Sequence, residues 1–449
     1  MTEILSLDML EKAQKMLNRY PLCNHCLGRQ FALLGYGIDN EKRGDALKLL
    51  LTMKAHQLAQ SKNKAGVTLL KILASNGNYP MAAEMLKKMK HKSTEASPCH
   101  LCQGRLESLE KLVNLALDKL KEYEYETTLV GIKLPVETEE REDELKGELT
   151  IRHGESLRNE FSRNIGKRLT ETTGKQIEYD RPDIVVLVNP FTEQMSLQAN
   201  PIYIGGRYRK LVRGIPQSRW LCRKCRGKGC KKCNWTGRMY PDSVEEIVGQ
   251  PILNITQGEE VTLHGAGRED IDVRMLGSGR PFVIEDKKPR KRLINLKNLE
   301  RTINKSAKGK VEVSNLYLAS KDVVRKLKLS ERAQKLYKAT IELDKRVSDR
   351  QLAALRKALT GAAIRQQTPK RVMHRRADLV REKHIYKAKV KRLTPNRFQI
   401  QIRCQGGLYI KELITGDEGR TVPSVAQILG AKAFPVELDV LGVYMEDDK

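Results

Sequence analysis

The sequence predicts an α+β protein with two lobes, and three observations support this fold class. First, a chain of 449 residues is too long for one ordinary core, so two to four domains are expected. Second, residues 1–125 place apolar residues at three- and four-residue spacing, as helices do, and strand-like segments begin near residue 126. Third, strands and helices mix again from residue 240 to the end.

The front half divides into a helical part and a smaller mixed part. Helices are expected for MLEKAQKML, GDALKLLLTMKAHQLAQ and SLEKLVNLALDKLKEY. After residue 126, TTLVGIKLP is typical of a strand, ESLRNEFSRNIGKRLTE of a helix, and PDIVVLVN and QMSLQANPIYI of further strands. The mixed part ends in GGRYRKLVRG at 205–214, where a tyrosine stands among basic residues. This pattern favours contact with an RNA backbone and stacking on a base, the alternative being a solvated loop.

The charge balance is the first functional clue. Lys and Arg number 83 against 55 Asp and Glu, a net charge of +28. Such an excess suits a polyanionic partner such as nucleic acid, although solubility or association with the ribosome would also explain it. The start, MTEILSLDML, does not resemble a signal peptide, and the apolar run at 184–188 is too short to cross a bilayer. We therefore expect a soluble, cytoplasmic protein with reduced thiols and no membrane partner.

Eight of the nine cysteines form four C-x-x-C pairs, which predict structural zinc. Two such pairs can complete a tetrahedral site of four thiolates. The first two pairs share a following Gly-Arg, and this similarity favours one site made of Cys23, Cys26, Cys99 and Cys102. Only four residues separate the other two pairs, so we expect a weaker second set: Cys222, Cys225, Cys230 and Cys233. A catalytic zinc of the deaminase type is disfavoured, because Pro98-Cys99 matches only half of the H-x-E and P-C-x-x-C pattern.

The segment HGAGREDIDVRMLGSGRPFVIE at 264–285 is the candidate active site. Gly265 and Gly267 allow a close backbone approach, and residues 268–275 are expected to continue as a strand. A lone aspartate can act as a covalent nucleophile when a neighbouring cation keeps it ionised. The alternative for these residues is a salt-bridged strand end.

Four motifs in this order resemble those of a known family. G-R-E-D at 267–270 is similar to the G-R-x-D and H-R-x-D motifs of pseudouridine synthases. The longer string GREDIDVRMLGSGRPF resembles the tRNA pseudouridine synthases that carry a THUMP domain and a cysteine-bound zinc. KLYKATIE at 335–342, QTPKRVMHRRAD at 367–378 and QIRCQGGLYIKEL at 401–413 resemble further motifs of that family. The resemblance thus spans nearly the whole chain.

The resemblance implies a domain arrangement and a set of site residues. It implies a helical zinc-binding module at 1–125, a THUMP-like RNA-binding domain at 126–215, a cysteine-rich connector at 216–240, and a catalytic domain with a mixed sheet at 241–449. It implies the following roles: Asp270 as nucleophile, Tyr337 over the target base and able to take the proton of carbon 5, Lys411 as the cation beside Asp270, Tyr409 and Leu413 as pocket walls, and Arg268 as support for the flipped backbone. Asp272 is a second candidate nucleophile.

The substrate that the resemblance implies is the T-arm of tRNA, at position 54, 55 or both. Isomerising uridine gains no atoms and loses no electrons, so the chemistry needs no nucleotide or redox cofactor. The basic segments at 286–292 and 367–378 are expected to clamp the RNA, and the protein is expected to act as a monomer. Two alternatives remain: a non-catalytic RNA-binding chaperone on a synthase scaffold, and an RNA methyltransferase. Residues 200–203 resemble a methyltransferase N-P-P-Y motif only faintly, and no glycine-rich loop for a methyl donor precedes them.

Overall fold

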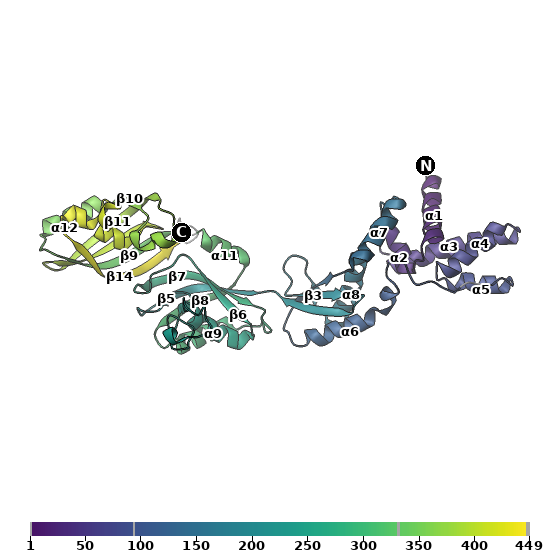
Figure 1. Cartoon of the computed structure of the whole chain (residues 1–449), viewed down its shortest axis with the longest axis horizontal. Helices are drawn as coiled ribbons and strands as arrows, with labels where there is room; N and C mark the ends of the chain where they lie inside the picture. The colour runs from purple at the N-terminus through teal and green to yellow at the C-terminus, as the bar shows by residue number, and fades with distance from the viewer. Residues whose placement is uncertain (1, 93–94, 330–332, 446–449) are drawn as a thin grey trace. The chain divides into compact units, whose positions relative to one another are not determined.

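The computed structural model describes residues 2–92, 95–329 and 333–445, and the chain divides into two compact units. Unit 1 is Met1–Asn200 and unit 2 is Pro201–Lys449 (Figure 1). The fold is α+β with two lobes, as the sequence predicts. The boundary between the units lies earlier than the expected end of the THUMP-like part at residue 215. The reason is strand β5 (Ile202–Lys210), which pairs with strands of unit 2 on both of its sides.

Unit 1 begins with a helical part. Its helices are α1 (Thr2–Arg19), α2 (Asn24–Gly28), α3 (Asn40–Gln60), α4 (Lys64–Ser75), α5 (Pro80–Lys88) and α6 (Leu109–Leu120). The three helices that apolar spacing predicts are confirmed as α1, α3 and α6. Helix α3 begins where the Asp39 side chain accepts a hydrogen bond from the Lys42 N–H at 2.8 Å, a usual cap for the first turn. Leu17, Leu51 and Leu70 form part of the core that these helices share.

The second part of unit 1 is a four-stranded sheet with two helices. Its elements are β1 (Thr127–Ile132), α7 (Val136–Glu148), α8 (Leu157–Thr173), β2 (Gln176–Ile177), β3 (Ile184–Asn189) and β4 (Gln194–Ala199), and the strand order is β2-β1-β3-β4. Every second residue of β3 is buried, as expected for a sheet with one face on the core. Helix α7 was not predicted, because its acidic sequence buries little beyond Thr138, Glu142 and Leu145.

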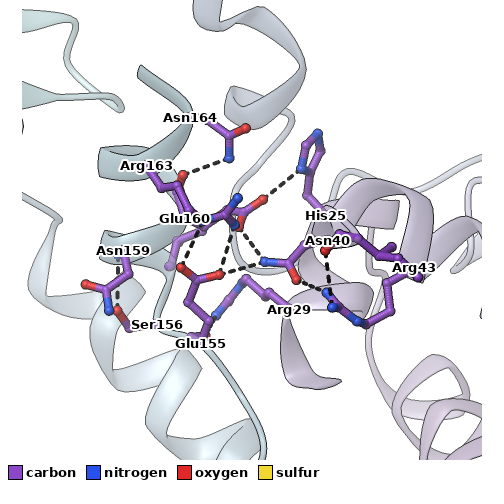
Figure 2. A network of polar contacts seen from close by, with 12 residues as sticks. His25, Arg29, Asn40, Arg43, Glu155, Ser156, Asn159, Glu160, Arg163 and Asn164 are labelled. Atoms are coloured by element: carbon purple, nitrogen blue, oxygen red, sulfur yellow. Dashed lines mark hydrogen bonds and ion pairs between the residues drawn. The ribbon is translucent and has the colours of Figure 1, made fainter. Parts of the chain in front are cut away.

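A polar network joins the two parts of unit 1 (Figure 2). The buried carboxylate of Glu160 on α8 contacts His25 Nδ1 of α2 at 2.9 Å and accepts a hydrogen bond from the Asn40 amide of α3. Asn40 also donates to Glu155 at 2.7 Å, and Arg163 forms ion pairs with Glu155 and Glu160. His25 and Asn40 of the helical part are thus bonded to Glu155 and Glu160 of the mixed part, and these polar contacts stabilise the packing of the two parts.

Unit 2 is organised by one mixed sheet. Its strands are β5, β6 (Glu260–Gly265), β7 (Arg274–Lys287), β8 (Val311–Ala319), β9 (Gln334–Leu343), β10 (Ala363–Gln367), β11 (Val380–Thr394), β12 (Arg397–Gln405), β13 (Thr421–Val422) and β14 (Ala433–Tyr444). The order is β13-β10-β11-β12-β9-β14-β7-β5-β8, and β6 pairs with β7. The parallel pairing of β14 with β7 joins the two halves of this sheet at Asp439 and Arg274.

Short helices cover the sheet of unit 2. They are α9 (Val244–Thr256), α10 (Leu296–Ser306), α11 (Lys321–Lys328), α12 (Asp349–Leu359), α13 (Ile410–Thr415) and α14 (Val425–Leu429). Met275, Ile341 and Ile400 belong to the core beneath them. Across the residues that the structure describes, no helix is both long and apolar enough to cross a bilayer.

The structure places the segment GGRYRKLVRG differently from the solvent-facing position that stacking on RNA would require of its tyrosine. The segment forms the inner strand β5, and the side chains of Tyr208 and Lys210 are fully buried. Lys210 donates to the carbonyl oxygens of Ile215 and Asp270 at 2.9 and 3.1 Å. Tyr208 and Lys210 therefore contribute to the interior of unit 2, whereas Arg209 stays partly exposed and pairs with Glu312. The local sequence does not distinguish the buried cation of Lys210 from a cation on the surface.

Candidate active site and metal sites

Asp270 lies on the loop between β6 and β7. The strand expected over residues 268–275 is absent there: the Val273 N–H bonds the Asp270 carbonyl at 3.0 Å in a turn, and β7 begins only at Arg274. Gly267 has a φ of 84°, and a Cβ at this position would come within 2.9 Å of the Lys335 Nζ. The positive φ favours glycine here, and the lysine side chain would also have to move to make room for a larger residue.

A buried charge cluster holds this loop from below. The carboxylate of Glu269 accepts hydrogen bonds from Arg280 Nε at 2.9 Å and from the Tyr208 hydroxyl at 3.0 Å. Arg280 also donates to the Ala266 carbonyl at 2.7 Å, while Gln217 bridges the Tyr208 hydroxyl and the Gly267 carbonyl. Because both charges are paired inside the protein, these bonds hold the part of the loop that precedes Asp270.

Two cations face the Asp270 carboxylate. The Oδ2 atom lies 3.2 Å from the Arg371 guanidinium and 3.3 Å from the Lys411 ammonium. Lys411 also contacts Asp272 at 2.8 Å. Partial burial raises the pKa of Asp272, but the bond from Lys411 outweighs it, so the pKa of that carboxyl lies below its usual value. Lys411 therefore bridges both candidate nucleophiles. The Asp270 carboxylate forms a second ion pair, with Arg371, whereas Arg213 bonds the backbone carbonyl of Asp272 at 2.6 Å.

Asp270 opens into a cavity of about 350 Å³, within the range of sites for small molecules. Its lining combines two acids with many cations: Arg268, Lys335, Arg371, Arg376, Arg381, Lys383 and Lys411. A second hollow of about 540 Å³ also contains Asp270, together with Trp220 and residues 216–218. Such a lining suits an anionic ligand.

Tyr337 lies on β9 in the cavity wall, where its cross-strand partner Val440 of β14 also lines the cavity. Burial raises the pKa of the Tyr337 phenol well above its usual value. Burial thus disfavours the phenolate form of Tyr337.

The opposite wall is built around Tyr409 at the start of α13. Its backbone exchanges two hydrogen bonds with the buried amide of Gln366, and its hydroxyl accepts from Arg376 at 3.0 Å. The Arg371 guanidinium lies 5.8 Å from the centre of the Tyr409 ring and is held by the Glu412 carboxylate at 2.6 Å. Glu412 thus places the cation that faces Asp270.

Most expected site residues gather at this cavity, but one does not. Asp270, Arg268, Tyr337, Tyr409 and Lys411 line it, whereas Leu413 is fully buried in the core and is absent from the lining. The reason is helical geometry: Leu413 follows the first residues of α13, which face the cavity, and turns toward the core.

Sequence reasoning missed Glu269, Arg280, Arg371 and Glu412. All four lie within segments that the motifs single out, but the pairs Glu269–Arg280 and Arg371–Glu412 form only in the folded chain. Of the two basic segments, 367–378 reaches the cavity through Arg371 and Arg376. The segment 286–292 contributes no described lining residue, and Lys287 pairs with Glu260 at 3.1 Å.

The first cysteine group lies in the core of unit 1. The sulfur atoms of Cys23, Cys26, Cys99 and Cys102 all lie within 4.8 Å of one another, and those of Cys23 and Cys102 are 3.5 Å apart. Four thiolates at 2.3 Å from one zinc ion would be separated by about 3.8 Å. The expected grouping of the first two pairs is therefore present in the structure, and it could hold a metal ion.

A buried cation accompanies this group. The Lys48 ammonium is fully buried and donates to the carbonyls of Leu22 and Gly77 and to the Asn24 side chain, at 2.6–2.9 Å. Burial lowers the pKa of Lys48 to about 8, and the nearby cysteine thiolates oppose this shift. A cation in this place suits four thiolates around a divalent ion, which carry a net charge of −2.

The second cysteine group is equally well arranged, although the sequence made it the weaker candidate. The sulfur–sulfur distances are 3.9 Å for Cys222 and Cys230 and 3.8 Å for Cys225 and Cys233. Positive φ angles at Gly227 and Gly229 let the chain turn back within the four residues between the pairs. This group could hold a second metal ion.

Two family models match the chain. The model described as "Pus10, C-terminal" matches residues 203–444, and "Pus10 THUMP domain, archaeal" matches residues 112–189. Two relatives named tRNA pseudouridine synthase Pus10 are similar over nearly their whole length. The protein of Methanocaldococcus jannaschii is 45% identical, over 96% of this chain and 93% of its own. That of Methanothrix thermoacetophila is 41% identical, over 97% and 94%.

Solved structures overlap with the chain only in part. A Cbf5-Nop10-Gar1 complex gives a TM-score of 0.29 at 19% identity, over 45% of this chain and 46% of that one. A pseudouridylate synthase gives 0.20 at 14% identity, over 55% and 66%. The family models and the full-length relatives decide the assignment: the chain belongs to the Pus10 family of pseudouridine synthases.

Proposed function

We propose that this protein converts uridine to pseudouridine in the T-arm of tRNA, at position 54, 55 or both, with Asp270 as the nucleophile. The observation that carries the proposal is the pair of cations, Arg371 and Lys411, around a carboxylate that opens into a cation-lined cavity. The names of the relatives, which all specify tRNA, support the choice of substrate.

The reaction needs one ionised carboxylate in a defined place. The bond between ribose C1′ and N1 of the base breaks, a bond from C1′ to C5 forms, and the proton of C5 leaves while N1 gains one. Arg371 and Lys411 each form an ion pair with the Asp270 carboxylate and so hold it in place at the cavity. Attack on the ribose and attack on the base both begin from this carboxylate, and both conserve all atoms and electrons of the uridine.

Tyr337 packs against the target base in this proposal. Its raised pKa favours stacking over removal of the C5 proton, because a protonated phenol has no basic oxygen to offer near neutral pH. Val440 on the neighbouring strand completes this apolar face of the cavity. The base would thus be held flat between β9 and the walls contributed by Tyr409.

The uridine must leave its stack to reach Asp270, which costs a few kcal/mol and least in a loop. The cations of the cavity compensate by binding the phosphates on both sides of the flipped nucleotide. Arg268 and Arg376 both line the cavity and are exposed, and Arg376 belongs to the segment 367–378. The THUMP domain adds RNA contacts of its own, as does the segment 286–292 in our proposal.

We also propose that both cysteine groups bind structural zinc. Four thiolates complete the tetrahedral coordination of a zinc ion and leave no position for a substrate. In this proposal the ion therefore stabilises the fold and takes no part in the isomerisation. No nucleotide or redox group enters the proposed reaction.

The test is site mapping on tRNA transcripts. Unmodified tRNA is incubated with the protein, and pseudouridine is located by chemical modification and primer extension. Transcripts with cytidine in place of uridine 54, or of uridine 55, serve as matched controls. We expect modification in the T-arm that disappears when its own uridine is replaced. Pseudouridine elsewhere, or none at all with tRNA bound, would refute the proposed target.

A further inference from the structure

The second cysteine group lies in a strongly basic segment, residues 219–238, which we name the cysteine knuckle. It contains no acidic residue. Two of its cations, Arg219 and Arg238, pair with Glu246 of helix α9. The others are exposed and have no acidic partner among the residues that the structure describes: Arg223, Lys224, Arg226, Lys228, Lys231 and Lys232. This charge exceeds the net −2 of four thiolates around a divalent ion, so the knuckle remains cationic with metal bound.

Trp235 projects from the cysteine knuckle. It is 71% exposed, whereas Trp220, the other tryptophan of this chain, is partly buried. Trp235 and Asn234 both have positive φ, of 61° and 48°, which is unusual for a bulky residue. The Trp235 N–H bonds the Cys230 carbonyl at 3.0 Å, so the metal-binding turn itself fixes the tryptophan in this position. The backbone of the turn is therefore held in place, and it presents the indole to solvent.

The cysteine knuckle begins at the wall of the proposed active site. Trp220 lines the hollow that also contains Asp270 and Lys411, and it packs edge-on against Tyr240 with ring centres 5.7 Å apart. Leu221 and Arg238 close the base of the knuckle by a strand-like bridge. An RNA that places a nucleotide in the hollow therefore passes the start of the knuckle.

We propose that the cysteine knuckle binds an unstacked nucleotide of the same RNA whose uridine enters the cavity, with its base on Trp235 and its phosphates beside the six exposed cations. Aromatic platforms flanked by cations are a common way to bind unpaired nucleotides. The charge selects a polyanion, and the indole selects RNA with an available base. This inference rests on the proposed function for the identity of the RNA.

The fluorescence of Trp235 can be measured separately, because the chain has only one other tryptophan, Trp220. Unmodified tRNA is titrated into the full-length wild type and into Trp235→Phe, whose remaining indole is Trp220. The difference between the two emission signals belongs to Trp235. We expect this difference signal to be quenched on binding, since stacking on a base quenches indole emission.

Binding measurements give the second readout. Trp235→Ala should weaken tRNA binding by roughly 5- to 150-fold, and Trp235→Phe should weaken it less because phenylalanine keeps a stacking face. Replacing Lys231 and Lys232 by glutamine should lower the salt dependence of the affinity by about two units of log–log slope. The matched control replaces two exposed lysines of α10, Lys297 and Lys305, by glutamine. It removes the same amount of charge and should leave the affinity and its salt dependence near those of the wild type.

The outcomes separate this inference from the proposed function. Quenching with weakened binding in Trp235→Ala supports the contact, and unchanged melting curves of the variants exclude unfolding as the cause. If wild type forms pseudouridine while the Trp235 signal is unquenched and Trp235→Ala binds normally, the cysteine knuckle does not bind tRNA and the inference falls alone. If the signal is quenched while no pseudouridine forms, the proposed function falls and the contact stands.

Discussion

The two cysteine groups use the same four ligands in very different surroundings. In the first, Cys23 and Cys102 are 79 residues apart and all four cysteines are buried. In the second, Cys222 and Cys230 are 8 residues apart, and three of the four cysteines are partly exposed. The first group therefore joins distant parts of a core, whereas the second stiffens a short surface turn. Identical ligand spacing does not reveal which of these roles a C-x-x-C pair serves; burial and neighbouring charge do.

The largest expected effect comes from breaking the buried group. Cys102→Ser should lower the stability of unit 1 by more than about 3 kcal/mol, because binding of structural zinc contributes about 10–16 kcal/mol to folding in small domains. Zinc content by native mass spectrometry should fall by one equivalent, and limited proteolysis should cut within residues 1–200. Cys404→Ala, at a buried cysteine outside both groups, should retain all the metal. If the melting curve of Cys102→Ser matches that of the wild type, the buried cysteine group does not stabilise the core of unit 1.

The buried cation of the first group should matter next. Lys48→Met removes the charge and leaves the Leu22 and Gly77 carbonyls without their donor, which should cost about 2–3 kcal/mol. Lys54→Met, on the exposed side of the same helix, should change stability by less than about 0.5 kcal/mol. Thermal unfolding of both variants provides the measurement. Equal effects would mean that Lys48 does not stabilise this core.

The smallest effect on stability is expected at the exposed group. Cys233→Ser should remove one zinc equivalent but change the unfolding free energy of unit 2 by less than about 1 kcal/mol, because few buried contacts depend on this turn. Affinity for tRNA should nevertheless fall at least as much as in Trp235→Ala. Calorimetry and filter binding on one preparation would check both parts. Unfolding of unit 2 would show that the cysteine knuckle supports the core.

Much of the fold follows from the sequence because its signals are local. Apolar spacing predicts α3 and α6, and the run at 184–188 predicts β3. The same reasoning missed α7, since a mostly exposed acidic helix has no apolar stripe. It also misplaced β5, because pairing with β7 and β8 is a long-range property of the sheet.

The site shows the same division. Motifs locate Asp270, Tyr337 and Lys411, which the structure brings to one cavity. Arg371 and Glu412 escaped notice because their roles depend on segments that meet only in the fold. Leu413 was misplaced because a motif fixes spacing along the chain but not the direction in which a helical side chain points.

The central claim is that Asp270, rather than Asp272, is the nucleophile. The most direct test is the single-turnover rate of pseudouridine formation at saturating tRNA for wild type, Asp270→Asn and Asp272→Asn. Asp270→Asn should bind tRNA normally and lose at least about 10⁴-fold in rate, as expected for a lost nucleophile. Asp272→Asn should stay within about tenfold of wild type, because Arg371 and Lys411 still face Asp270. Rapid turnover by Asp270→Asn, or loss of turnover only in Asp272→Asn, would mean that Asp270 is not the nucleophile.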